Sequence, residues 1–257
     1  MTGLATGGAG AAPEVTEDGF LDGCVRLRQP AEGYRAAIDP VFLAAAVPAG
    51  EGERALDIGA GVGAAALLLA WRVPGLRVSG LEIDSALLRL AVDNARLNGM
   101  EARVEFMLGD LARPPARLAP GSFHHVLANP PYLEAARADP ATDEKRAAAT
   151  VEGEAGLAAW LRFGCMMARD NGTVTMIHRA DRLDELLAVL RGRAGGITVF
   201  PLWPDRGNGA AKRVLVQARK GARTPMRLAQ GLALHESDGR FTAEADAILR
   251  AGRALAL

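Results

Sequence analysis

Residues 129–132 read Asn-Pro-Pro-Tyr and combine groups that suit chemistry on an amino nitrogen. The side-chain oxygen of Asn129 and the main-chain carbonyl of Pro130 are acceptors for the two N–H bonds of such a group. The lone pair of an amide or aromatic amine is delocalised, so hydrogen bonds that favour a pyramidal nitrogen make it a better nucleophile through positioning and electrostatics. Tyr132 can stack on a planar target. The predicted catalytic residues are Asn129, Pro130, Pro131 and Tyr132.

A second motif, Asp57-Ile-Gly-Ala-Gly-Val-Gly63, follows an apolar strand predicted over 54–58 and precedes a predicted helix. Its glycines allow positive φ angles and let a ligand approach the main chain closely. Glu82 ends the next predicted strand, where its carboxylate can accept hydrogen bonds from both hydroxyls of a ribose. With Ala64 the glycine spacing also fits an NAD site, so the motif alone leaves the adenosine cofactor open.

Asp57 and Gly63 favour one of these cofactors. The pattern Asp-x-Gly-x-Gly-x-Gly over 57–63 resembles the loop of the Rossmann-like methyltransferases that use S-adenosylmethionine (SAM). The resemblance implies that the loop holds SAM, with Asp57 near the cationic part of the cofactor. It also implies that Asp110, at the end of the third predicted strand, accepts a hydrogen bond from the adenine amino group. We expect no metal ion at this site.

The chain between these motifs alternates strand, loop and helix at intervals of about 25 residues, which predicts parallel βαβ units. We predict an α/β fold with a Rossmann-like, seven-stranded, mostly parallel sheet, an antiparallel last strand and helices on both faces. The predicted strands span 54–58, 77–83, 104–108, 123–128, 173–178, 197–203 and 213–218. Asp57, Glu82, Asp110 and Asn129 would then lie at the carboxyl edge of the sheet, where such folds bind ligands.

The first 17 residues differ from the rest in composition. They are small, polar and rich in glycine and alanine, so they cannot bury enough surface to offset the entropy of ordering. We predict a disordered tail over 1–17 and a single methyltransferase domain over 18–257.

Longer segments resemble the bacterial tRNA (adenine-N6)-methyltransferases that modify the adenine beside the anticodon of a valine tRNA. The similar segments are Val25–Ala45, Glu144–Arg146, Ile177–Asp181 and Ala211–Gln217, together with the motif at 129–132. This resemblance implies a tRNA substrate and a segment over 34–39 that folds across the cofactor, with Asp39 as its best binding candidate. One residue departs from the pattern, because Leu133 stands where relatives often carry a second aromatic side chain. The predicted cofactor-binding residues are Asp39, Asp57, Gly59, Gly61, Gly63, Glu82, Asp110 and Asn129.

Three other functions remain open at this point. The Asn-Pro-Pro-Tyr motif is shared with enzymes that methylate a glutamine of a translation factor, although the chain begins without the helical substrate domain expected of them. The glycine spacing leaves an NAD-linked oxidoreductase as a further alternative. A non-catalytic RNA-binding relative is disfavoured because the motif is intact.

Charge excludes a protein that binds nucleic acid through its bulk charge, because 30 basic and 30 acidic residues cancel. Basic residues gather between 205 and 227, and they predict either a local tRNA-binding surface or charges that protect strand edges. The candidates for that surface are Lys212, Arg213, Arg219, Lys220 and Arg223.

The remaining features indicate a cytoplasmic protein without a membrane partner. Cys24 and Cys165 have no metal-ligand or redox spacing, which is the pattern of a reducing compartment. No apolar run reaches the 18 or so residues of a membrane helix, and the N-terminus does not resemble a signal peptide. Nothing in the sequence specifies an oligomeric state.

Overall fold

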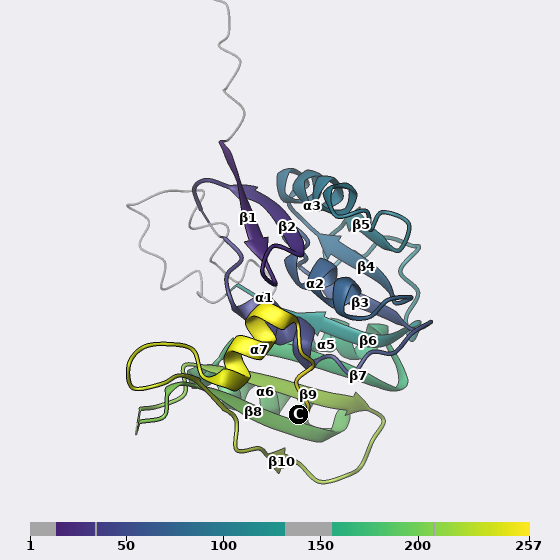
Figure 1. Cartoon of the computed structure of the whole chain (residues 1–257). Helices are drawn as coiled ribbons and strands as arrows, with labels where there is room; N and C mark the ends of the chain where they lie inside the picture. Colours follow the sequence, from purple (N-terminus) through teal and green to yellow (C-terminus); the bar gives the residue numbers. More distant parts are fainter. Residues whose placement is uncertain (1–13, 34, 132–155, 208) are drawn as a thin grey trace, which may run out of the picture.

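A nine-stranded sheet forms the centre of the protein in a computed structural model (Figure 1). The structure describes residues 14–33, 35–131, 156–207 and 209–257. Tyr132, Leu133 and the segment Glu144–Arg146 therefore lie outside the described residues. The strand order is β10-β8-β9-β7-β6-β3-β4-β5, and β11 also pairs with β8.

All seven predicted strands are present, and the predicted fold class is confirmed. They are β3 (Arg54–Ile58), β4 (Arg77–Glu82), β5 (Val104–Leu108), β6 (Phe123–Ala128), β7 (Ala168–Arg179), β8 (Ala194–Asp205) and β9 (Arg213–Lys220). They are parallel except for β9, which runs antiparallel to both β7 and β8, as predicted. Two short strands, β10 (Arg227–Leu228) and β11 (Leu232–His235), pair in parallel with β8 and were not predicted, because such short segments carry no period.

Helices cover both faces of the sheet because the strands are apolar on both sides. In β3, for example, Ala55 belongs to one core cluster, while Leu56 and Ile58 belong to the other. The first face carries α1 (Asp39–Ala46), α2 (Ala64–Arg72), α3 (Ser85–Leu97) and α7 (Ala243–Ala251). The second carries α5 (Leu157–Met167) and α6 (Leu183–Leu190), the latter preceded by the short 3-10 helix η2 (Ala180–Arg182).

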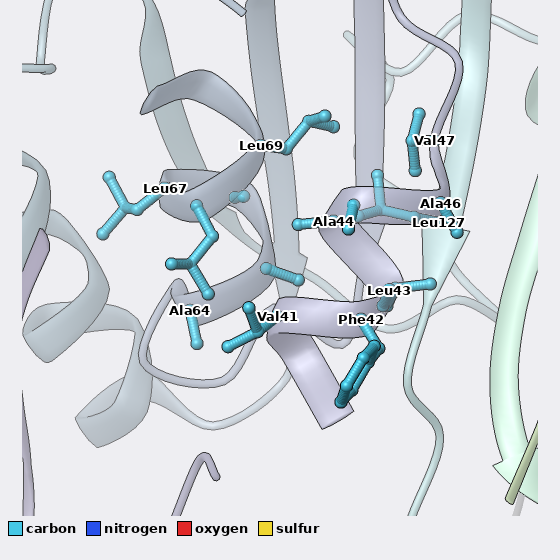
Figure 2. Packing of buried hydrophobic residues seen from close by; sticks show 14 of the residues in the cluster. Val41, Phe42, Leu43, Ala44, Ala46, Val47, Ala64, Leu67, Leu69 and Leu127 are labelled. Carbon is cyan, nitrogen blue, oxygen red and sulfur yellow. The ribbon is translucent and has the colours of Figure 1, made fainter. Parts of the chain in front are cut away.

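The contact between α1 and α2 forms part of the first core (Figure 2). Helix α1 is buried from Pro40 to Ala46, and alanines in both helices let the two backbones approach closely. Phe42 and Leu67 are fully buried, and each such side chain stabilises the fold by about 1.5–3 kcal/mol. This packing fixes the start of α1 beside the loop that precedes α2.

A hairpin of β1 (Val15–Phe20) and β2 (Val25–Pro30) packs over the α3 side of the sheet (Figure 1). Residues 15–17 therefore lie in a strand, and the predicted end of the tail at residue 17 is wrong; residues 1–13 lie outside the described residues. The polar sequence of β1 gives no strand signal, because this strand forms through its pairing with β2. The free edge of β2 is in turn capped by two asparagines of α3. Asn94 accepts from the N–H of Arg28 (2.7 Å) and donates to its carbonyl (3.0 Å), and Asn98 binds Arg26 in the same way.

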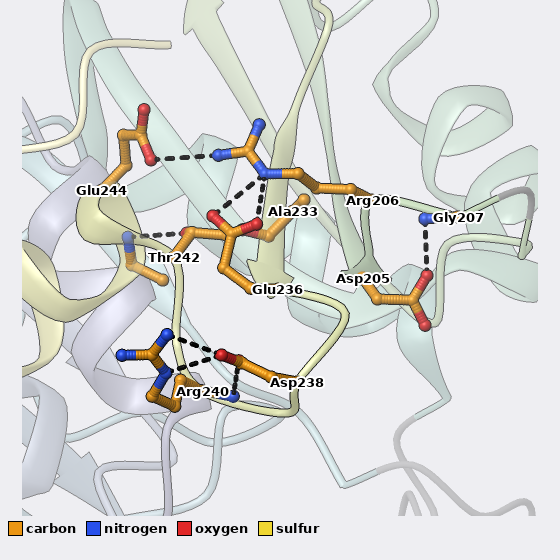
Figure 3. A network of polar contacts seen from close by, with 10 residues as sticks. Asp205, Arg206, Gly207, Ala233, Glu236, Asp238, Arg240, Thr242 and Glu244 are labelled. Atoms are coloured by element: carbon orange, nitrogen blue, oxygen red, sulfur yellow. Dashed lines mark hydrogen bonds and ion pairs between the residues drawn. The ribbon is translucent and has the colours of Figure 1, made fainter.

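Polar contacts hold the C-terminal segment against the end of β8 (Figure 3). Thr242 caps α7 by accepting from the N–H of Ala245, and it donates to the carbonyl of Ala233 in β11. Arg206, just after β8, forms ion pairs with Glu236 and Glu244. These exposed contacts hold α7 and β11 against the end of β8.

Candidate functional site

A pocket lies at the carboxyl edge of the sheet, where β3 and β6 end. It brings together four of the predicted site residues, Asp57, Gly59, Gly61 and Asn129. Helices α1, α2 and α3 add Pro40, Ala65 and Leu87 to its lining. Residues more than 70 positions apart in the sequence thus meet because parallel strands end at the same edge.

The three glycines of the loop have positive φ angles but different surroundings. A Cβ atom at Gly59 would lie 2.3 Å from the Trp160 ring, and one at Gly63 would lie 2.6 Å from the Phe106 ring. At Gly61, by contrast, no described atom lies within 4 Å of that position. Gly59 and Gly63 are therefore required for packing, whereas Gly61 leaves open space at the pocket for a ligand to contact the main chain.

Asp57 is 2% exposed and accepts a hydrogen bond from the N–H of Ala66 in the first turn of α2 (3.1 Å). Burial raises the pKa of Asp57 to about 8, and the nearby carboxylate of Glu82 adds to the rise. A buried carboxyl group with so high a pKa favours a cationic neighbour, because a positive charge would stabilise its ionised form.

Glu82 is also buried, and it holds the glycine loop from the neighbouring strand. Its Oε2 accepts from the N–H of Gly61 (2.7 Å), and its Oε1 accepts from the N–H groups of Ile83 and Asp84 (both 2.9 Å). Burial raises the pKa of Glu82 despite these three hydrogen bonds. Two acids beside one loop would repel a pyrophosphate, and they suit a cationic adenosine cofactor that presents ribose hydroxyls.

Asn129 follows β6 directly and lies at the pocket, as its place after the strand predicts. Pro130 is buried and Pro131 is partly buried, so the backbone behind Asn129 is fixed by both packing and ring geometry. The fourth predicted catalytic residue, Tyr132, lies outside the described residues. The described part of the motif therefore has the placement that polar contact with a planar amine requires.

Four of the predicted cofactor residues do not line the pocket: Gly63 and Glu82, whose contacts are described above, and Asp39 and Asp110. Asp39 occupies the first turn of α1 and accepts from Nε of Arg213 (3.0 Å), while its neighbour Pro40 lines the pocket. Asp110 follows β5, and its Oδ1 accepts from the N–H of Ala112 (2.8 Å), closing a turn. A role for either carboxylate in binding the cofactor remains a prediction.

The structure adds residues that sequence reasoning missed. Leu87 lines the pocket, and its ordinary apolar side chain carries no sequence signal; Ala36 also lines it and belongs to the segment 34–39 that was predicted to fold across the cofactor. Ile83 is 68% exposed directly after Glu82, where it offers an apolar surface to a planar ring. Asn94 is fully buried and donates to the carbonyl of Val62 in the glycine loop (2.9 Å), which ties the loop to the hairpin. Of the residues that were missed, only Ile83 had a signal in the sequence, because it is an aliphatic residue directly after the acid that ends a strand.

The five basic residues predicted as a surface do not lie together. Lys212 and Arg213 are at the carboxyl edge, because Arg213 pairs with Arg179 at the end of β7. Arg219 and Lys220 are at the other end of β9 and bind the carbonyls of Asn171 and Ala168 near the start of β7. Arg223 is also at that amino edge, next to Gly195 at the start of β8. The five candidates therefore do not form one cluster, because the eight-residue strand β9 separates its ends by more than 20 Å; their role in binding tRNA remains a prediction.

The described residues offer neither a metal-binding cluster nor a membrane-spanning helix. They contain no group of three or more His, Cys, Asp or Glu side chains that could hold a metal ion. Their helices include none with both the length and the apolar character needed to cross a membrane.

Comparison with known sequences places this site in a methyltransferase. Residues 38–151 match the family described as Methyltransferase small domain. The chain is 28% identical over 212 residues to the tRNA1(Val) (adenine(37)-N6)-methyltransferase of Aeromonas hydrophila, covering 81% of this chain and 85% of the relative. It is 40% identical over 91 residues to the release factor glutamine methyltransferase of Rhodospirillum rubrum, covering 35% of this chain and 27% of that relative. The predicted resemblance to both groups of enzymes is confirmed.

Comparison with solved structures also indicates a methyltransferase. A predicted O-methyltransferase from Agrobacterium tumefaciens superposes with a TM-score of 0.72 at 28% identity, covering 85% of this chain and 99% of the other. The prediction of a Rossmann-like methyltransferase is confirmed, and the NAD-linked alternative is not supported.

Proposed function

We propose that this methyltransferase uses SAM to methylate the exocyclic N6 amine of an adenine in tRNA, and that it acts in the cytoplasm. One observation carries the proposal: Asn129 of the Asn-Pro-Pro-Tyr motif lies in the same pocket as the glycine loop and the buried acid Asp57. A group that suits amine binding is therefore adjacent to a site that suits a cationic adenosine cofactor.

The pocket residues fit SAM in three respects. Glu82 accepts three main-chain hydrogen bonds and keeps about one of the four acceptor sites of its carboxylate for a ribose hydroxyl. Asp57 offers a buried carboxyl group whose ionised form a cation would stabilise. Gly61 exposes its main chain without a Cβ, and Ile83 offers an apolar surface for the adenine ring. When bound, SAM supplies an electrophilic methyl group on a sulfonium ion.

Asn129 and Pro130 then act on the target amine. The Asn129 side-chain oxygen and the Pro130 carbonyl accept its two N–H bonds and direct its lone pair toward the methyl donor. The nitrogen becomes acidic once it is alkylated, so its proton can leave without a strong general base. The chain therefore contributes positioning and electrostatics more than proton transfer. Tyr132 is proposed to stack on the base, and Asp39 and Asp110 to assist in holding the cofactor.

The relatives support tRNA as the substrate. The tRNA1(Val) (adenine(37)-N6)-methyltransferase of Aeromonas hydrophila is matched along 85% of its length. By analogy, the target is the adenine beside the anticodon of a valine tRNA. Lys212 and Arg213 stand at the carboxyl edge, on the side of the sheet that a bound RNA would approach.

A second candidate is N5-methylation of a glutamine in a translation factor. It is favoured by the 40% identity to the release factor glutamine methyltransferase, which is higher than that to the tRNA enzyme. That match spans only 27% of the relative, however, and so it concerns the shared catalytic core. The tRNA enzymes match along most of both chains, and for that reason we prefer the RNA substrate.

Isotopically labelled SAM distinguishes the two substrates. The protein is incubated with total tRNA in one reaction and with translation factors in another, and nucleosides and peptides are examined by mass spectrometry. We expect labelled N6-methyladenosine in tRNA and no labelled glutamine. Labelled glutamine without labelled adenosine would establish the second candidate, and absence of both labels would contradict either proposal.

A further inference from the structure

We propose that Arg179, Lys212 and Arg213 bind a phosphate of the RNA backbone next to the target adenine. This inference rests on the proposed function, because it assigns the surface that would hold the RNA at the same site. The three residues come from the end of β7 and the start of β9. Arg179 was not among the basic residues that the sequence singled out.

Strand register places these residues beside the catalytic motif. Ala128 of β6 is level with Met176 of β7, so the motif that follows Ala128 runs alongside Ile177 to Arg179. Arg179 in turn pairs with Arg213 across the β7–β9 ladder, and the N–H of Ala180 donates to the carbonyl of Lys212 (3.2 Å). Neighbouring strands are about 4.8 Å apart, so β9 lies about 10 Å from β6 across the sheet. That is a suitable separation for a phosphate whose base reaches Asn129.

The charges at this edge gather around a buried histidine. His178 is fully buried in β7, between the motif strand and β9. Burial lowers the pKa of His178 to about 4, and the positive charges of Arg182, Arg179 and Arg213 contribute to the decrease. The three guanidinium groups are therefore close enough together to act on one ring. Such a convergence of arginines around a neutral side chain suits an anion.

Each arginine already has a carboxylate partner, and the exposure of each pair determines which can exchange it. Arg179 pairs with Asp181 through side chains that are 34% and 57% exposed, and Lys212 is also exposed. Ion pairs of this kind contribute at most about 1 kcal/mol, so a phosphate that accepts two N–H bonds from Arg179 can compete with Asp181. Arg182, only 11% exposed, is held by Glu185, and we assign it no contact with the RNA. Arg213 stays paired with Asp39, which is only 15% exposed, and it contributes positive charge beside Arg179 and Lys212.

The same strand provides a matched control. Arg179→Gln and Lys212→Gln each remove one positive charge at the carboxyl edge of the sheet, whereas Arg219→Gln removes one at the amino edge of the sheet, near the far end of β9. Steady-state methylation of tRNA is measured for all four proteins between 50 and 300 mM salt, together with the Kd for SAM and the thermal unfolding midpoint. Each lost phosphate contact should reduce the slope of log(kcat/KM) against log[salt] by about one and raise KM about three- to tenfold.

The expected result is a raised KM and a shallower salt slope for Arg179→Gln and Lys212→Gln, with kcat and the Kd for SAM unchanged. Arg219→Gln should match the wild type. A slope and KM unchanged in both edge variants, while the wild type methylates tRNA, would overturn this inference and leave the proposed function intact. If the wild type methylates a protein and no RNA, the proposed function fails first.

A synthetic stem-loop that the wild type methylates gives a second measurement independent of folding effects. One phosphate at a time is replaced by a neutral methylphosphonate. One position near the target adenine should raise the KM of the wild type and leave that of Arg179→Gln unchanged. If Arg179→Gln loses as much affinity as the wild type at every position, the assignment of Arg179 is wrong.

Discussion

Strands β6 and β7 bury a histidine at each end of the sheet, and the two histidines have opposite neighbours. At the amino edge, His125 binds Oγ1 of Thr173 (2.8 Å) and Oε2 of Glu53 (2.7 Å). Burial alone would raise the pKa of Glu53, yet hydrogen bonds from Gly50 and His125 leave it lowered. The polar groups of this edge therefore satisfy one another.

At the carboxyl edge, groups of like charge gather instead. Asp57 and Glu82 lie together on one side of the motif, and burial raises the pKa of both. On the other side, His178 lies among arginines and has a lowered pKa. This arrangement suits a cation beside the acids and an anion beside the arginines. The amino edge of the sheet thus contributes stability, whereas the carboxyl edge keeps like charges together at a cost in stability, as binding sites often do.

The largest effect is expected from removing the amine-binding group at the carboxyl edge. Asn129→Ala should lower kcat by about 10²–10³-fold, because one preorganised acceptor for the target amine is lost. The Kd for SAM should change less than about threefold, since the glycine loop and Glu82 remain. Single-turnover methylation and calorimetry measure the two quantities. An equal loss of SAM binding and methyl transfer would contradict the assigned role.

The next effect concerns the buried acid. The folded-state pKa of Asp57, about 8, lies above its unfolded value, so the folded protein retains a proton that the unfolded chain releases. The stability from Asp57 is complete below pH 4 and decreases as pH rises toward 8, by about 1.4 kcal/mol per unit. Asp57→Asn should remove this slope, so its free energy of unfolding should gain about 2–3 kcal/mol relative to the wild type between pH 6 and 8.

Urea unfolding at several pH values tests that change, and SAM provides an independent check. Because the cation lowers the pKa of Asp57, binding at pH 7 should release a proton. Calorimetry in buffers of different ionisation enthalpy detects such release in the wild type and should find less in Asp57→Asn. A stability difference independent of pH would show that Asp57 titrates normally.

His178 and His125 should affect stability at low pH differently, and this difference distinguishes the two edges of the sheet. A lowered pKa means that the folded protein prefers neutral His178, so its stability is complete above pH 6.5 and is lost as pH falls toward 4. The loss from His178 amounts to up to about 3 kcal/mol. His178→Gln should therefore lose less stability than the wild type between pH 6.5 and 4. His125→Gln should differ less from the wild type, because Glu53 supports the protonated form of His125. Equal acid profiles for the two variants would remove this contrast.

The smallest effects come from adding one methyl group at each edge. Gly61→Ala places a Cβ in open space at a φ of 58°, which costs about 1 kcal/mol of stability. It should weaken SAM binding about tenfold, because the methyl group occupies the ligand side of the loop. Gly172→Ala at the amino edge meets two carbonyl oxygens at 2.9 Å, so it should lower stability without changing the Kd for SAM. Thermal unfolding with and without SAM compares the two; unchanged SAM binding in Gly61→Ala would place the ligand elsewhere.

Much of the fold could be predicted from the sequence because its signals are local. Apolar strands, glycine turns and prolines act within a few residues, so the seven main strands, including the antiparallel last one, were predicted correctly. Strand β1 was missed, because it is polar and depends on pairing with β2, which is held in turn by Asn94 and Asn98 of α3, more than 60 residues away.

The candidate site likewise has features that the sequence predicts and features that depend on the tertiary structure. The sequence by itself determined that Asp57, Glu82 and Asn129 end parallel strands, which is enough to assign them to one edge. Only the tertiary structure decided that Leu87 completes the pocket, and that Gly61 alone of the three loop glycines faces open space among the described residues. It also decided that Lys212 and Arg219 belong to opposite edges. Spacing along a chain specifies an element and its ends, whereas burial, charge and pKa depend on what distant segments place beside them.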